Sequence, residues 1–285
     1  MTVPFKVDLS GKVAVVTGGG GILCSVMAEA IAECGAKVAI LDLRKDAADK
    51  VAQKINAAGG QAIGVACNVL ERAELEAALA TVKAELGPCD ILVNGAGGNN
   101  PKGTTAGEVM TKEDLTSNDP DKRNFFTLDP KGIEFVFNLN VISAMLTTQV
   151  FSKDMCAKGQ GVIINVSSMN AFRPLTKIPA YSAAKAAVSN FTQWLAVHLA
   201  PMGIRVNAIA PGFFLTDQNR SLLTNPDGSL TPRSHKILNG TPMNKFGTPE
   251  DLLGALLWLL SDAGAGFVTG TVIPIDGGFS AYSGV

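Results

Sequence analysis

Two side chains that stand four residues apart carry the clearest chemical pattern in this sequence. Tyr181 and Lys185 belong to an Ala-rich run, Ala180 to Leu199, which contains no Gly or Pro and predicts a helix. Positions four apart share one face of a helix, so the phenol and the ammonium would be neighbours. A nearby positive charge favours the phenolate and lowers the pKa of a tyrosine from its usual value of about 10. The pair therefore predicts a tyrosine that exchanges a proton with a substrate oxygen near neutral pH.

A serine upstream adds a second reactive group. Ser168 ends the segment Gly161 to Ser168, an apolar run that predicts a buried strand with a polar end. A strand-end serine before a helix that carries Tyr and Lys resembles the short-chain dehydrogenase/reductase family. The resemblance implies that Ser168 orients and polarises a carbonyl and that Tyr181 gives or takes the proton. It also implies that Lys185 lowers the tyrosine pKa and holds the ribose of a nicotinamide cofactor.

Two further segments match the same family. The resemblance implies that Asn140 completes a catalytic tetrad by holding a backbone carbonyl and, through it, a water that relays protons to Lys185. Asn140 is preferred to Asn138 because of its spacing to Gln149. The segment 203–216 resembles the family's strand followed by Pro-Gly-x-x-x-Thr, which contacts the nicotinamide amide. The cofactor contacts that this match implies are Pro211, Gly212, Phe214 and Thr216.

The N-terminal part predicts a phosphate-binding unit. An apolar strand, Lys12 to Thr17, runs into four glycines and then into a helical stretch, Ile22 to Cys34. Small residues let the backbone approach a pyrophosphate, and the helix N-terminus offers N–H groups and a partial positive charge. In the family pattern Thr-Gly-x-x-x-Gly-x-Gly, Ile22 and Cys24 replace the second and third glycines. A flexible turn is the alternative interpretation. The expected contacts are Gly18, Gly20, Gly21, Ile22 and Leu23.

The acid at the end of the second predicted strand, Ala36 to Asp42, indicates the cofactor type. A carboxylate at this distance from the glycines accepts hydrogen bonds from the adenosine ribose. Because Asp42 would repel a 2′-phosphate, NAD(H) is favoured over NADP(H). Arg44 could instead hold that phosphate, and a turn-capping role is the structural alternative for Asp42.

Five residues farther along complete the expected cofactor contacts. The third strand, 61–66, is followed by Asn where the family usually has Asp against the adenine. The fourth strand ends in Asn-Gly-Ala-Gly, where the family has Asn-Asn-Ala-Gly, so one position departs. The resemblance implies that this Asn ties strands together and that the small residues leave room for the cofactor. The five residues are Asn68, Val69, Asn94, Ala96 and Gly97.

The segment 98–131 is the least typical part of the sequence. It is rich in Gly, Asn, Asp, Thr and Pro, and it lengthens the interval between two family motifs. Long loops in compact domains are usually functional or disordered, so we expect a wall or lid of the active site, with an oligomer contact or a loose loop as alternatives. The candidate substrate contacts are Asn99, with Asn100 and Lys102 nearby, then Asn170, Arg173 and Arg220. A solvated position is the alternative for both arginines.

Composition sets the outer limits. The chain has 285 residues, 30 glycines and a net charge of −1. The run of apolar strands alternating with helices predicts a single α/β Rossmann domain over residues 1–285, with a doubly wound, mostly parallel seven-stranded sheet and helices on both faces. Dispersed basic residues predict no nucleic-acid partner. The five cysteines form no metal-ligand spacing, so we expect no metal and free thiols in a reducing cytoplasm.

Expectations for targeting and assembly follow from the same features. We see no signal peptide, and the longest apolar run, 252–260, is shorter than the ~20 residues that span a bilayer, so no membrane partner is expected. The ending Asp276-Gly-Gly resembles a family segment that lies at subunit interfaces, which implies a homotetramer. The polar region 213–248 resembles the family's substrate-binding loop with short helices.

The substrate is indicated by a narrower resemblance. The glycine run, the insertion and the segment Gly212 to Arg220 together resemble the bacterial D-mannonate oxidoreductases of the short-chain type, which implies a sugar acid substrate and the pair D-fructuronate and D-mannonate. Amides followed by Arg220 suit a hydroxylated anion, because Arg pairs bidentately with a carboxylate. A gluconate 5-dehydrogenase-like or polyol dehydrogenase is the alternative enzyme. A catalytically silent dinucleotide-binding sensor or scaffold is the alternative of another class.

Overall fold

The computed structural model describes residues 7–116, 119, 121–215 and 223–284. Seven strands form one sheet in the order β3-β2-β1-β4-β5-β6-β7, and every neighbouring pair is parallel. The strands are β1 (Val13–Thr17), β2 (Lys37–Asp42), β3 (Gln61–Ala66), β4 (Ile91–Asn94), β5 (Gly161–Val166), β6 (Ile204–Pro211) and β7 (Val272–Ile275). The predicted doubly wound sheet is confirmed, and it is parallel throughout.

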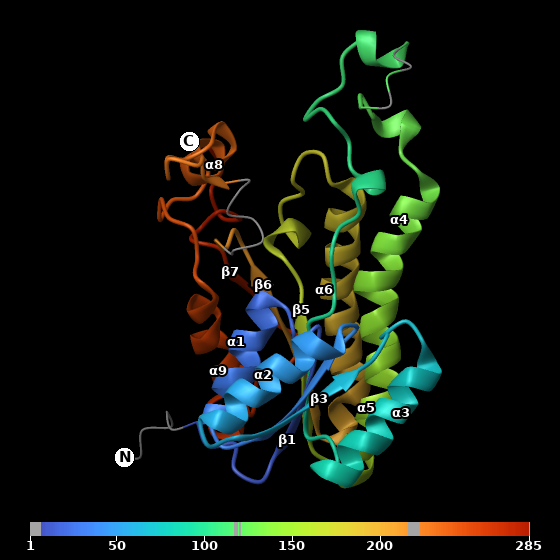
Figure 1. Ribbon diagram of the computed structural model, residues 1–285, viewed down its shortest axis with the longest axis vertical. Helices are drawn as coiled ribbons and strands as arrows, with labels where there is room; N and C mark the ends of the chain where they lie inside the picture. Colours follow the sequence, from blue (N-terminus) through green and yellow to red (C-terminus); the bar gives the residue numbers. More distant parts are fainter. Residues whose placement is uncertain (1–6, 117–118, 120, 216–222, 285) are drawn as a thin grey trace.

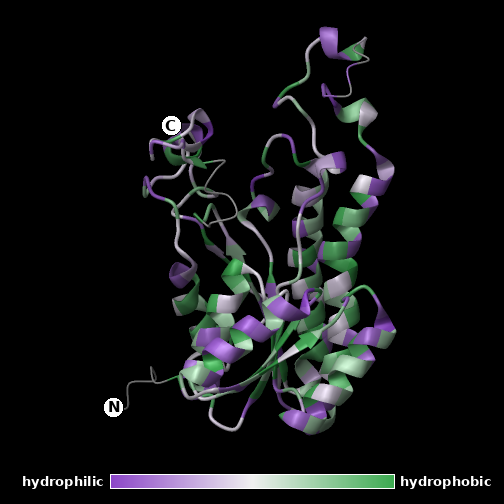
Figure 2. Cartoon of the chain, in the orientation of Figure 1, coloured by the Kyte–Doolittle hydropathy of each residue, from purple (hydrophilic) through white to green (hydrophobic). Residues whose placement is uncertain are grey.

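Helices cover both faces of this sheet (Figure 1). One face carries α1 (Ile22–Glu33), α2 (Lys45–Ala57) and α9 (Leu253–Leu260), and the other carries α3 (Arg72–Glu85), α5 (Ser143–Lys158) and α6 (Pro179–Leu199). Shorter helices are α4 (Pro130–Phe137), α8 (Pro232–Asn239) and α10 (Asp262–Ala265). Two large apolar clusters fill the space on the two sides of the sheet. Figure 2 shows the hydrophobic residues concentrated on the strands and on the inner faces of the helices, as burial of apolar surface requires.

Helices α4 and α5 form one continuous helical stretch, Pro130–Lys158, joined by the π-helical segment η4 (Asn138–Ile142). By length and composition alone this stretch is long and apolar enough to cross a membrane. Its most apolar window is 56% buried inside the protein, and a core helix of a folded domain meets the same criterion. It packs against α3 and α6, so its apolar character is accounted for within the domain.

The strand order places the ends of the central strands at one edge. The order reverses between β1 and β4, because β1 is followed along the chain by β2 on one side and the chain returns through β4 on the other. Ligands of open α/β sheets bind in the crevice at such a switch point, outside the carboxyl ends of the strands. The loops that follow β1, β4, β5 and β6 therefore meet where the predicted functional residues lie.

The segment 98–131 projects beyond the helices at this end of the sheet (Figure 1). It contains three short 3₁₀ turns, η1 (Pro101–Gly103), η2 (Glu113–Leu115) and η3 (Phe125–Thr127). Its two arms are held together, because the Ala106 N–H donates to the Arg123 carbonyl at 2.7 Å and the Arg123 guanidinium donates to the Pro101 carbonyl at 2.8 Å. The remaining 3₁₀ turns are η5 (Met169–Ala171), η6 (Ala200–Met202) and η7 (Pro249–Leu252).

Candidate active site

Ser168, Tyr181 and Lys185 meet at the carboxyl end of β5. Ser168 follows that strand and caps η5, where its hydroxyl accepts a hydrogen bond from the Asn170 N–H at 3.2 Å. Tyr181 stands in the first turn of α6, near enough to Ser168 for the serine side chain to lower the tyrosine pKa. The Nζ of Lys185, one turn farther on, lies 5.6 Å from the centre of the tyrosine ring. The predicted neighbourhood of the three side chains is present.

Burial dominates the protonation of Lys185. Its side chain is 4% exposed, and its Nζ donates a hydrogen bond to the Val166 carbonyl at 2.8 Å. Removal of the ammonium from water disfavours the charged form, so burial lowers the pKa of Lys185 to about 8. The lysine therefore titrates within the range in which enzymes work.

Burial also governs Tyr181, and here one expectation is wrong. The sequence predicts that Lys185 lowers the pKa of Tyr181, but in the protein alone the tyrosine pKa is raised, because the phenol is removed from water. The Ser168 side chain opposes this rise and has the weaker effect on the tyrosine pKa. The lysine ammonium is itself desolvated and bound to a carbonyl, which limits what its charge contributes. The phenol is consequently held in its protonated form.

Asn140 is fixed within the π-helical segment. Its amide nitrogen donates to the Gly98 carbonyl at 2.7 Å and to the Val136 carbonyl at 2.8 Å, and its Oδ1 accepts from the Gly98 N–H at 3.3 Å. The residue is 2% exposed. Short π segments inside α-helices are frequent at functional sites. This one turns the Asn140 side chain out of the helix and onto the start of the insertion.

The turn after β4 connects the glycine loop to Asn140. The Thr17 hydroxyl accepts from the backbone N–H of Gly95 and of Ala96, at 3.1 and 3.2 Å. A Cβ on Gly97 would lie 2.7 Å from the Asn140 Oδ1 and 3.2 Å from the Lys185 Nζ. No larger residue fits Gly97 without displacing one of these two side chains.

Asn94 joins adjacent strands, as the resemblance implies. Its amide nitrogen donates to Asn165 on β5 at 2.8 Å and to the Thr148 hydroxyl at 3.0 Å. These contacts fix the end of β4 against β5 and α5, and with it the turn that carries Ala96 and Gly97.

The glycine loop fits a dinucleotide. Gly18 has a φ of +61°, and a Cβ there would lie 2.9 Å from the Ala96 Cα, so the position requires glycine. The Gly20 N–H donates to the Asp42 carboxylate at 3.1 Å, and a Cβ on Gly20 would lie 2.9 Å from that oxygen. Gly21 is the N-cap of α1 and supplies no capping side chain. The first N–H groups of α1 are thus available to a phosphate, with Ile22 and Leu23 in the first turn.

Two of the departures from the family's motifs, Cys24 and Gly95, meet in space. Cys24 stands at the third glycine position, on α1, and Gly95 stands at the second Asn position, after β4. The Cys24 sulfur occupies the place that a Cβ on Gly95 would need. Burial raises the pKa of the Cys24 thiol to about 12, so it packs as a neutral group. Cys24 on α1 is larger than the glycine it replaces, and Gly95 after β4 is smaller than the asparagine it replaces, so the two residues fit together.

The remaining predicted cofactor contacts lie at strand ends. Asn68 and Val69 follow β3, and the Asn68 Oδ1 accepts from the Leu70 N–H at 3.1 Å. Gly212 follows β6, and a Cβ there would lie 2.6 Å from the Asp276 Cα. Phe214 is buried and bridges to Gly247. Pro211 ends β6. Thr216 lies outside the described residues.

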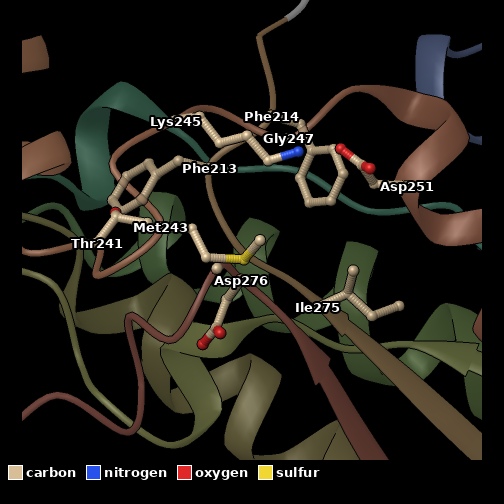
Figure 3. A pocket seen from close by; sticks show the side chains of 10 residues that line it. Phe213, Phe214, Thr241, Met243, Lys245, Gly247, Asp251, Ile275 and Asp276 are labelled. Atoms are coloured by element: carbon tan, nitrogen blue, oxygen red, sulfur yellow. The ribbon is translucent and has the colours of Figure 1, made fainter.

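A pocket of about 170 Å³ lies beside Phe213 and Phe214, which follow the Pro211-Gly212 turn (Figure 3). Phe213 and Phe214 line different sides of it, and Asp276 lies at its base. The Asp276 carboxylate accepts from the N–H groups of Gly278 and Ser280, at 2.9 and 2.8 Å. The residues that line this pocket do not include Ser168, Tyr181 or Lys185, so it is separate from the reacting groups.

The predicted substrate contacts differ in their surroundings. Asn170 is 5% exposed, and its Oδ1 accepts no hydrogen bond from the described residues. Asn99 donates to the Thr104 hydroxyl at 3.0 Å. The exposed Arg173 donates to the Ser280 carbonyl at 3.1 Å, and Lys102 pairs with Asp129 at 3.7 Å. Asn170 thus has a free acceptor beside Ser168, whereas Arg173 and Lys102 have protein partners.

Two expectations remain. Arg220 lies outside the described residues. Within the described ranges, no three His, Cys, Asp or Glu side chains are grouped as a metal site would require.

The sequence carries no signal that the backbone carbonyls of Gly98 and Val136 would bind Asn140, because backbone carbonyls are the same in every residue.

Comparisons with known proteins agree with this geometry. A family model for the short-chain dehydrogenase family matches residues 12–227. An uncharacterized oxidoreductase of Haemophilus influenzae is 54% identical over 285 residues, covering 100% of this chain and 99% of the relative. The 7alpha-hydroxysteroid dehydrogenase of Escherichia coli is 33% identical over 95% of this chain and 94% of the relative.

A solved structure gives the same result in three dimensions. The crystal structure of a Haemophilus influenza protein with bound NAD, provisionally named a D-mannonate oxidoreductase, superposes with a TM-score of 0.93. The two are 53% identical, and the match covers 100% of both chains. The family match extends over most of the sequence and contains the strand-end serine and the Tyr-Lys helix, so this chain belongs to the short-chain dehydrogenase family of oxidoreductases acting on CH–OH groups.

Proposed function

We propose that the protein is an NAD(H)-dependent oxidoreductase that interconverts D-fructuronate and D-mannonate. The observation that carries this proposal is the likeness, over the full length of both chains, to the NAD-bound protein that is provisionally named a D-mannonate oxidoreductase. Because the match covers 100% of both chains, it extends over the insertion, which we expect to form a wall of the active site. An insertion that both proteins carry supports a shared substrate.

The roles of the reacting residues follow from their surroundings. Ser168 and Tyr181 donate hydrogen bonds to the substrate carbonyl oxygen, and Tyr181 supplies its proton. The raised pKa of Tyr181 keeps this proton in place at neutral pH, which suits the reductive direction. A bound nicotinamide supplies the hydride. Lys185 holds the ribose and keeps a positive charge beside the phenol. Asn140 holds the Gly98 carbonyl and orders the proton relay.

The surroundings of Asp42 support NAD(H) over NADP(H). Its carboxylate accepts from the Gly20 N–H and from the Arg44 N–H, at 3.1 and 3.0 Å, so it is held at the end of β2. The Arg44 side chain is 63% exposed and its Nε lies 3.9 Å from the carboxylate. The fixed group at this position is thus the anion, which repels a 2′-phosphate.

A hydroxylated substrate is supported by Asn170. A buried acceptor without a partner costs free energy, and a substrate hydroxyl would supply the missing donor. Asn99, Arg173, Arg220 and Thr216 stay predicted contacts of the substrate or cofactor.

The test is the oxidation of NADH by D-fructuronate, measured beside 5-ketogluconate, fructose and a simple ketone, and repeated with NADPH. Preferential turnover of D-fructuronate with NADH would support the proposal. Turnover of 5-ketogluconate or of neutral ketoses alone would support the gluconate 5-dehydrogenase-like or polyol dehydrogenase alternative. NADH binding without turnover of any carbonyl would support a silent binder.

We also propose a cytoplasmic homotetramer. All five cysteines are free thiols, which suits a reducing compartment. On the outer face of α6, Trp194 is 58% exposed and Val197 is 77% exposed, beside a groove of about 700 Å³ between α5 and α6. Exposed apolar surface of this kind is typical of a contact between subunits.

A further inference from the structure

The insertion is tied to the substrate-loop region by one ion pair. Glu108 lies on the insertion and Lys236 lies on α8, 128 positions later in the sequence. The Lys236 Nζ lies 2.9 and 3.1 Å from the two carboxylate oxygens of Glu108. Both side chains are well exposed, at 46% and 70%.

The insertion is also tied to the loop that leads into the catalytic helix. The Thr105 N–H donates to the Lys177 carbonyl at 2.8 Å. Lys177 lies four residues before Tyr181. Its φ is +72°, a value that few non-glycine residues adopt. The insertion therefore contacts the loop before α6 at the residue with this unusual backbone conformation.

The Glu108 carboxylate is paired with Lys236, and two further cations act on it through their charge. Lys236 is bonded to it, and the charges of Lys177 and Arg233 lie close enough to lower its pKa further. These cations come from two elements that are distant in the sequence, the loop before α6 and α8. Glu108 balances one of three positive charges, so the cluster keeps a positive field.

The segments that meet at this cluster are connected along the chain to the reacting groups. The insertion begins at Gly98, whose N–H and carbonyl both bond to Asn140. The loop that carries Lys177 begins after Ser168, and α8 follows the Pro-Gly loop after β6. Two of the three segments that meet at Glu108 therefore start directly beside reacting groups, at Gly98 and at Ser168.

We propose that Lys177, Arg233 and Lys236 form an anion-receiving site at the substrate entrance, and that Glu108 occupies it until the carboxylate of an incoming substrate replaces it. The inference rests on the proposed function, because it needs a substrate that carries a carboxylate. An exposed ion pair contributes little stability, so a competing carboxylate can displace Glu108. The same contact joins the insertion to α8 when the site is empty and is given up when substrate arrives.

The decisive comparison is between Glu108→Gln and Lys236→Gln. Both variants break the ion pair, but only the first frees the cations. The measurement is the affinity of the NADH-loaded protein for D-mannonate. NADH and D-mannonate cannot react with each other, because both are in their reduced form. D-Mannitol, which has the same hydroxylated carbon skeleton without a carboxylate, is the neutral control.

We expect Glu108→Gln to bind D-mannonate about two- to fivefold more tightly, as loss of one exposed competitor allows, and Lys236→Gln to bind it more weakly. D-Mannitol binding should not change, and the difference should vanish at about 1 M salt, where charges are screened within ~3 Å. Equal effects of both variants on D-mannonate, or no effect of either, would overturn the anion-receiving site.

Amide hydrogen exchange reports the contact without any substrate. Exchange of residues 104–110 should be faster in both single variants and return toward the wild-type rate in the charge-swapped double variant Glu108→Lys/Lys236→Glu. Unchanged exchange in the single variants would show that the ion pair does not hold the insertion and would overturn the proposal. Failure of the proposed function can be distinguished from failure of this inference. If the proposed function is wrong, the wild-type protein itself does not reduce D-fructuronate.

Discussion

The sulfur of Cys24, on α1, fills the space in which a Cβ on Gly95, after β4, would have to stand. This contact joins the helix after the glycine loop to the turn whose Gly97 lies against Asn140 and Lys185. Two departures from the family's sequence pattern are therefore one structural feature: a wider residue on the helix and a narrower one on the turn. The pair keeps the spacing of the glycine loop without the third glycine.

The first prediction concerns this pair. Gly95→Ala should lower stability by about 1–3 kcal/mol through overpacking, and it should weaken NADH binding because the glycine loop is displaced. Cys24→Ala/Gly95→Ala should recover more than half of both losses, since the sulfur is gone. Some loss should persist, because the added Cβ also lies 2.8 Å from the Thr17 carbonyl. Thermal unfolding and NADH titration measure the effect. Additive losses in the double variant would show that the two positions are not coupled.

The second prediction concerns cofactor choice. Asp42→Ser should raise kcat/KM for NADPH and lower it for NADH, because a carboxylate close to a 2′-phosphate costs several kcal/mol and each ~1.4 kcal/mol is a factor of ten. We expect at least a tenfold change in the ratio. Adding Arg44→Gln to Asp42→Ser should remove part of the gain with NADPH, because the Arg44 guanidinium lies beside position 42 and would attract a 2′-phosphate there. An unchanged ratio in Asp42→Ser would mean that Asp42 does not select the cofactor.

The third prediction separates Asn140 from its neighbour Asn138 in the same π segment. Asn140→Ala removes the amide that holds the Gly98 and Val136 carbonyls, so kcat should fall about tenfold or more while NADH binding changes little. Asn138→Ala is the matched control and should leave kcat near the wild-type value. Equal losses in both variants would indicate a general disturbance of the helix instead of a role in the relay.

The fourth prediction is a pH dependence. Lys185, with a pKa of about 8, is charged below that pH and neutral above it. Tyr181 has a raised pKa and stays protonated in this range. In the reductive direction, kcat/KM should therefore fall as the pH rises through about 8. Lys185→Arg should retain part of the activity and lack this descending limb, because a guanidinium does not titrate there. A limb that persists in Lys185→Arg would assign it to another group.

The sequence is a good guide wherever structure depends on neighbours along the chain. Short apolar runs ended by glycines or polar residues predict all seven strands, because parallel strands buried on both faces are continuously apolar. Ser168, Tyr181 and Lys185 fall within one strand end and one helix turn, so their grouping can also be predicted.

Other features depend on contacts between distant residues or on burial. The Glu108–Lys236 pair joins segments that carry no shared motif, and the sequence offers no signal for it. The expected lowering of the Tyr181 pKa is wrong, because the sequence shows the adjacent lysine and not the depth at which both groups are buried. The Cys24–Gly95 contact has a signal, since both positions depart from the same pattern, but only the fold shows that they touch.

The most direct test of the proposed function is the NADH-dependent reduction of D-fructuronate, with the product identified, in the wild type and in Tyr181→Phe. We predict that the wild type forms D-mannonate with a higher kcat/KM than it shows for fructose. We also predict that Tyr181→Phe loses turnover while still binding NADH. Faster reduction of fructose than of D-fructuronate, or full turnover in Tyr181→Phe, would contradict the proposed function.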